Sequence, residues 1–179
     1  NSSASANLKK QQGSYFTTDF GYVLDFDKRN QKFQTSDGFF SSYSLDLPLI
    51  SDTYTLINSY RYKFFTELYE NNVSTLSVSL NSAHSLKNED IKLSERLRVP
   101  SNILRGFENG KVGPKDGDDF IGGNYMTAIN FTTTLPQILP NSQNTDIVLF
   151  FDAANIWGVD YNSSLDDNKV KSSIGIGLD

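Results

Sequence analysis

The stretch YFTTDFGYVLDFD, from Tyr15 to Asp27, has the alternating pattern that decides the fold class. Successive side chains of a β-strand point to opposite faces of its sheet, so this period of two predicts a strand. The acids of the stretch all lie on one face. The first face carries Phe16, Thr18, Phe20, Tyr22, Leu24 and Phe26, and the second carries Tyr15, Thr17, Asp19, Gly21, Val23 and Asp25.

The same alternation recurs along most of the chain and predicts about seven strands and no helix. The further predicted strands span residues 39–47, about 53–69, 76–81, 124–135, 146–153 and 170–178. Because most neighbouring strands are joined by short links, an antiparallel meander is the simplest topology. The sequence therefore predicts the all-β class.

Charged residues within the predicted strands lie on one face only, which favours a transmembrane β-barrel. A charge at the lipid-facing midplane costs about 2–4 kcal/mol for Arg or Lys, so a lipid-facing side stays uncharged. Aromatic residues near strand ends, among them Tyr15 and Trp157, fit the aromatic girdles of such barrels. The alternative is a soluble β-sandwich whose aromatic residues pack a core.

The composition excludes several other classes. No stretch approaches the ~18 consecutive apolar residues of a spanning helix, which excludes a helical membrane protein. The net charge of -5, without a basic stripe, argues against nucleic acid as a partner. The chain has no Cys and one His, His84, and so lacks a metal-ligand pattern. We therefore expect no metal, no cofactor, no catalytic residue and no enzymatic activity.

A long segment, about 86–120, has no strand pattern, and segments of this length are usually functional or disordered. It contains spaced glycines and distinct short motifs. These motifs are Leu104-Arg105-Gly106-Phe107, Gly113-Pro114 and, at the start of the next strand, Gly122-Gly123-Asn124. Further along, residues 150–158 read FFDAANIWG.

The ordered set RGF, VGP, GGN and FFDAANIWG resembles the C-terminal barrel of the BamA family of outer-membrane assembly factors and its relatives in translocation and secretion. The resemblance runs from about Tyr15 to the end and is strongest from Val99 to Gly158. It departs from the family at Ala154, where a Gly is usual, and at Thr132, where a Glu is common.

The resemblance implies that the 86–120 loop folds back from the outer mouth into the barrel lumen, where Arg105 meets Asp152. The alternation places Asp152 on the polar, inward face independently of the resemblance. An Arg and a carboxylate can form a bidentate pair, which would hold a loop whose ordering costs entropy. The alternative is that a wet lumen solvates both charges.

The resemblance also implies a function in the bacterial outer membrane. The full protein would fold and insert β-barrel proteins there, with outer-membrane lipid, unfolded β-barrel clients and assembly-complex lipoproteins as partners. The alternatives are the barrel of a polypeptide-secretion transporter, two-partner or TamA-like, and the soluble β-sandwich as a binding module.

Residues 1–179 are expected to be a partial barrel domain. Closed bacterial barrels have at least about eight strands, so about seven form an open sheet with unpaired edges. By the resemblance, further barrel strands lie on both sides of the chain, and periplasmic POTRA domains precede it.

Overall fold

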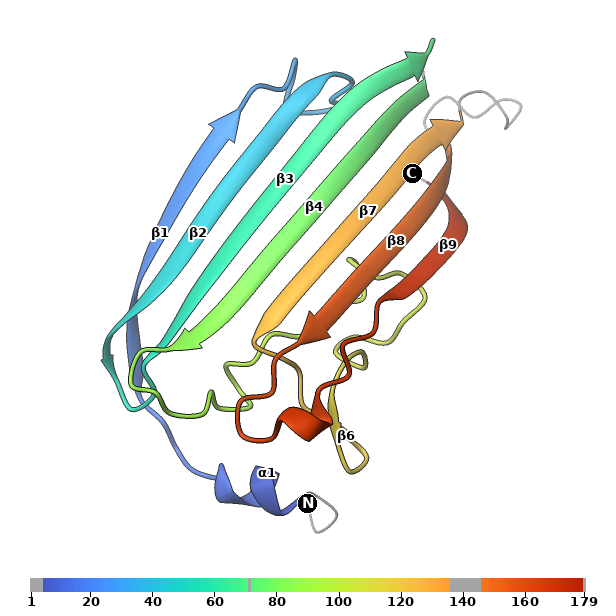
Figure 1. Cartoon of the computed structure of the whole chain (residues 1–179). Helices are drawn as coiled ribbons and strands as arrows, with labels where there is room; N and C mark the ends of the chain where they lie inside the picture. Colours follow the sequence, from blue (N-terminus) through green and yellow to red (C-terminus); the bar gives the residue numbers. More distant parts are fainter. Residues whose placement is uncertain (1–4, 71, 136–145, 179) are drawn as a thin grey trace.

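The computed structural model describes residues 5–70, 72–135 and 146–178. Within these residues, seven strands form one antiparallel sheet, ordered β1-β2-β3-β4-β7-β8-β9 (Figure 1). The strands are β1 (Thr17–Asp27), β2 (Gly38–Ser51), β3 (Thr55–Tyr69), β4 (Asn72–Ser85), β7 (Tyr125–Leu135), β8 (Ile147–Trp157) and β9 (Lys171–Leu178). The sheet is open, because its end strands β1 and β9 do not pair with each other. The all-β class, the meander and the unclosed sheet are therefore confirmed.

Besides a single-turn 3-10 helix at Ser163–Leu165, two short features were not expected from the sequence. Helix α1 (Ala6–Lys10) begins where the Ser5 hydroxyl accepts a hydrogen bond from the N–H of Leu8, so the prediction of no helix is wrong there. Strands β5 (Lys115–Asp116) and β6 (Asp119–Phe120) form a tiny hairpin inside the long loop, where no strand was predicted. Both are too short to produce a readable hydrophobic period. No helix in the described residues has the length and apolar character to cross a membrane.

The register of the strands sorts the side chains onto two faces. One unbroken row across six strands is apolar: Phe39, Phe64, Leu76, Phe131, Phe151 and Ile174. The adjacent row, on the opposite face, runs through Phe40, Lys63, Ser77, Asn130, Asp152 and Ser173. A slip of one residue in any strand would exchange the two sets, so the alternation fixes the register. We call these the outer and the inner face.

The outer face is apolar and uncovered by the described chain. Phe20 is 54% exposed and Ile174 is 82% exposed. A soluble β-sandwich would bury such residues between two sheets, so their exposure contradicts that alternative. It suits a surface that meets hydrocarbon.

Aromatic residues cluster near both ends of the sheet. Tyr125 stacks on Trp157 with ring centroids 5.7 Å apart, and it makes a T-shaped contact with His84 at 5.4 Å between centroids. Toward the other end, Phe39 contacts Phe26 and Tyr62, each with 5.7 Å between centroids. These positions agree with the girdles expected at the two membrane interfaces.

The long loop between β4 and β7, residues 86–124, lies against the inner face of the sheet (Figure 1). A buried apolar cluster forms between them: Val99, Leu104 and Val112 from the loop, and Met126, Ala128, Ala154 and Ile156 from β7 and β8. The expectation of a mainly polar inner face is therefore wrong at this place. The loop covers these positions, and its own apolar side chains replace water there.

Candidate functional site

Arg105 and Asp152 form a bidentate ion pair between the long loop and β8. The Nε and Nη2 atoms of Arg105 each donate to one carboxylate oxygen of Asp152, both at 2.7 Å. The backbone N–H of Arg105 donates to Oδ2 as well, at 3.1 Å. The side chain of Asp152 is fully buried, whereas that of Arg105 is 33% exposed. This fork geometry fixes both the position and the direction of the loop.

Two neighbours on β7 complete the hydrogen bonding of the pair. Asn130 lies directly opposite Asp152 in the sheet and donates to its Oδ1 at 2.8 Å. The same amide donates to the carbonyl of Ile103 and so holds the loop a second time. Thr132, where the family commonly has a Glu, accepts from Nη2 of Arg105 at 3.3 Å. Both oxygens of the buried carboxylate are thus satisfied, which a buried charge requires.

An aromatic ring supports the guanidinium of Arg105. Its Cζ lies 3.7 Å from the ring centroid of Phe150, a cation–π contact. Phe150 stands opposite Gly175 of β9 in the register, and a Cβ on Gly175 would lie 2.5 Å from the ring. The absence of a side chain at Gly175 therefore leaves room for the ring beneath Arg105.

The other residues of the RGF motif hold the loop by packing. Leu104 is completely buried in the inner cluster, and Phe107 is partly buried against it. Gly106 has a φ of 85°. Gly113 has a φ of 99°, and a Cβ there would lie 2.1 Å from Cγ2 of Ile156, so only glycine fits. Pro114 is fully buried, and its carbonyl accepts from the N–H of Ile121 at 3.0 Å.

The GGN motif joins the loop to the start of β7. Gly123 and Leu97 exchange backbone hydrogen bonds of 2.9 and 3.1 Å. Gly122 is buried, with a φ of 70°. The N–H of Asn124 donates to the carbonyl of Gly158 at 3.0 Å. The structure thus places all the predicted site residues along one loop and its contacts with β7 and β8.

Arg96 and Asp160 form a second anchor, which the sequence reasoning missed. The side chain of Arg96 is fully buried, ion-paired to Oδ1 of Asp160, and donates from Nε to the carbonyl of Ile91 at 3.1 Å. The N–H of Ile91 donates to Oδ2 of Asp160 at 2.7 Å. Both partners lie in loops 64 residues apart, where no periodic pattern exists to pair them. The nearest recognisable motif in the sequence is FFDAANIWG, which ends two residues before Asp160 and contains neither partner.

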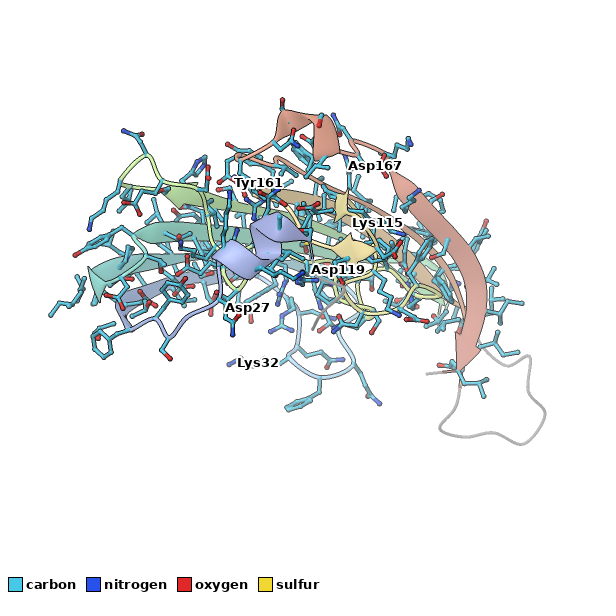
Figure 2. All side chains as sticks on the ribbon, turned by 90° about the horizontal axis from the view of Figure 1, so that it is seen from below. Asp27, Lys32, Lys115, Asp119, Tyr161 and Asp167 are labelled. Atoms are coloured by element: carbon cyan, nitrogen blue, oxygen red, sulfur yellow. The ribbon has the colours of Figure 1, made fainter. Side chains whose placement is uncertain are left out.

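Two side chains in and beside the second anchor, both outside the strands, have shifted pKa values. Burial acts to raise the pKa of Asp160, but the N–H of Ile91 and the charge of Arg96 together hold it below its usual value. Burial, with a hydrogen bond to Asp116, raises the pKa of Tyr161 to about 12. Figure 2, seen from below, shows Tyr161 at the same end of the sheet as α1 and the β5–β6 hairpin. The Tyr161 hydroxyl donates to Asp116 at 3.1 Å, and Asp116 also accepts from Ser5 at 2.8 Å.

Taken together, these contacts make the site an anchoring device. Arg105 ties the middle of the loop to the inner wall, and Arg96 ties its beginning to the β8–β9 connection. Both contacts are charge-assisted and shielded from water on at least one side, so each holds its loop in a single place.

Comparisons with known proteins agree with this fold. A family model described as the Omp85 superfamily domain matches residues 1–179. The chain is 23% identical over 181 residues to "Outer membrane protein assembly factor BamA" of Neorickettsia risticii, covering 98% of this chain and 24% of that protein. It is 35% identical over 63 residues to a SAM50-like protein of Schizosaccharomyces pombe, covering 35% of this chain and 13% of that protein.

A solved structure also shares the architecture. Crystalline BamA from Haemophilus ducreyi, lacking POTRA domains 1–3, superposes with a TM-score of 0.78 at 22% sequence identity. The match covers 89% of this chain and 35% of that one, so the chain spans about a third of that structure and about a quarter of the Neorickettsia protein. The family match spans the whole sequence, and the chain therefore belongs to the Omp85 superfamily.

Proposed function

We propose that this chain supplies part of the barrel wall and the lumenal loop of an outer-membrane insertase, which folds and inserts β-barrel proteins into the bacterial outer membrane. The observation that carries the proposal is the loop bound to the inner wall by Arg105 and Asp152. The similarity to an outer membrane protein assembly factor supports it. The role is mechanical: the chain contributes shape and stiffness, with no catalytic residue and no cofactor.

The anchored loop would stiffen one side of the barrel. Ordering a loop costs about 1–2 kcal/mol of backbone entropy per residue, so a loop of this length stays in place only with strong attachment. The ion pair and the buried Leu104 supply that attachment. Because the anchored loop would hold this part of the barrel wall in one conformation, conformational change would be confined to other strands of the full barrel.

The lipid partner follows from the exposed outer face, and the protein partners follow from the similarity to an assembly factor. The uncharged outer face would contact outer-membrane lipid, which places the chain in the outer membrane. Unfolded β-barrel proteins are the proposed clients, and lipoproteins of an assembly complex are the proposed accessory partners. A barrel that secretes one dedicated polypeptide is the alternative with the same fold.

The test uses the full-length protein reconstituted in liposomes, with an unfolded β-barrel client added and its folding followed by protease protection. We expect wild type to accelerate folding and Arg105→Ala to lose most of that acceleration. Lys111→Ala is the control, because Lys111 belongs to the same loop and makes an exposed pair with Glu108. Unchanged acceleration by Arg105→Ala would remove the proposed role of the anchor. Failure of wild type to accelerate any client, with export of a dedicated polypeptide instead, would favour the transporter.

A further inference from the structure

A cavity of about 290 Å³ lies on the inner face beside the Arg105 anchor, between β3, β4 and the tip of the long loop. Arg61 and Lys63 of β3 line one side, Ser77 and Ser79 of β4 lie beside them, and Asn102 and Arg105 of the loop line another. We propose that this cavity binds an oxyanion, a carboxylate or a phosphate group. The proposal goes beyond the proposed function and does not depend on it.

The cavity carries uncompensated positive charge. Arg61 and Lys63 are two residues apart on one strand, so they share the inner face. Across the sheet, Arg61 meets Ser42 and Ser79, and Lys63 meets Phe40 and Ser77, with no acid directly opposite either. Among the described residues, the ion pairs include neither of these two cations. Neighbouring like charges repel, so an anion between them would be stabilised.

The third cation at the cavity, Arg105, is differently placed. Asp152 already neutralises its charge through Nε and Nη2, and these bonds hold the guanidinium still. The side chain remains 33% exposed, on the side that lines the cavity. A fixed guanidinium with an open edge is a suitable extra donor for an oxyanion.

The lining and the size of the cavity suit a small hydrated anion. The hydroxyls of Ser77 and Ser79 and the amide of Asn102 are neutral hydrogen-bond donors around the cations. A water molecule occupies about 30 Å³ in the liquid, so the cavity has room for a phosphate or carboxylate with part of its hydration shell. Arg61 is exposed and Lys63 half-buried, so both side chains can reach an incoming anion.

The occupant would sit next to the loop anchor, and its binding would therefore be linked to the position of the loop. An anion that contacts both β3 and Arg105 binds only when the loop is docked, and so stabilises the docked loop by mass action. This link predicts that phosphate protects the long loop from proteolysis more than chloride does at equal ionic strength.

The experiment uses the full-length protein in detergent micelles and the broadening of the ³¹P resonance of inorganic phosphate, with acetate as competitor. We expect broadening with wild type, at least a tenfold weaker affinity for Arg61→Gln/Lys63→Gln, and displacement of phosphate by acetate. Lys32→Gln is the control, because Lys32 is an exposed cation of the β1–β2 connection (Figure 2). It is not among the residues that line the cavity. Comparison of the phosphate and acetate affinities identifies which oxyanion the cavity prefers.

Two results of the phosphate-binding experiment would overturn the proposal. One is the absence of broadening with wild type, as expected if an acidic side chain from another part of the barrel already fills the cavity. The other is an equal loss of phosphate affinity in the double variant and in Lys32→Gln. That result would mean that phosphate is attracted to the positive charges of the protein in general and not to this cavity. Should the double variant fail to fold, the wild-type protease assay in phosphate and in chloride decides: equal cleavage in the two salts overturns the site.

Discussion

The guanidinium of Arg105 lies with its Cζ 3.7 Å from the ring centroid of Phe150, while its Nε and Nη2 donate to the carboxylate of Asp152. Two contacts of different kinds therefore converge on this side chain, a ring and a carboxylate, and the neighbouring residue Leu104 adds hydrophobic packing.

Removing Arg105 and removing Asp152 should destabilise the protein by different amounts. Arg105→Ala leaves Asp152 fully buried with a charge, whereas Asp152→Ala leaves Arg105 one-third exposed to a hydrated cavity. Breaking a buried pair in the first way costs about 3–5 kcal/mol, and the second change should cost clearly less. Thermal unfolding of the full-length protein in micelles measures both. Adding Asp152→Asn to Arg105→Ala should recover stability, and a further loss in that double variant would contradict the assignment.

The position of the Phe150 ring beneath Arg105 should depend on Gly175, the residue opposite it on β9. Gly175→Ala places a Cβ 2.5 Å from the ring, which must move and withdraw its support from Arg105. The matched control is Gly177→Ala on the same strand and face, where the new Cβ would lie 3.1 Å from Val148 and away from Arg105. We expect faster proteolysis of the long loop in Gly175→Ala only. Equal rates in the two variants would show that Phe150 does not position the loop.

The burial of Leu104 should contribute about as much to the free energy of unfolding as the Arg105–Asp152 ion pair does. Leu104 is 0% exposed, and Leu→Ala substitutions in well-packed cores cost about 2–5 kcal/mol. Leu86→Ala is a control in the same loop, because Leu86 is 51% exposed. Denaturant unfolding should show a large loss for the first variant and less than about 0.5 kcal/mol for the second. A small effect at Leu104 would mean that the loop is held by the ion pair alone.

The second anchor should weaken in acid. The folded pKa of Asp160 is lowered, so its contribution is complete above the unfolded value of about 3.9 and is lost as the pH falls through the lower folded value. Cleavage of the long loop by pepsin, followed from pH 4.5 downward, should therefore accelerate in wild type. In Asp160→Asn the cleavage should be faster at pH 4.5 and change less with pH. Identical profiles would exclude Asp160 as the titrating group.

The strands and their two faces could be predicted from the sequence because the alternation is visible within each strand alone. The alternation around Phe20 and Leu149 assigns each strand residue to a face without knowledge of its neighbours, and both are exposed on the outer face. The same rule places Asp152 on the inner face, whereas only the family resemblance indicates Arg105 as its partner.

The remaining contacts depend on how distant segments meet, which a period of two does not encode. Arg96 and Asp160 pair between two loops, and Phe150 meets Gly175 only through the register of β8 and β9. Ile156 points inward although it is apolar, because the loop covers it. A strand pattern alone could not show that cover.

The central claim is that one face of this sheet meets lipid and the other looks into a lumen. The chain contains no Cys, so single cysteines carrying nitroxide labels at residues 20–25 can be introduced into the full-length protein with any other cysteines replaced. Accessibility to oxygen, which concentrates in hydrocarbon, should peak at positions 20, 22 and 24, and accessibility to a water-soluble nickel complex should peak at 21, 23 and 25. The reverse phase, or no alternation at all, would contradict the account.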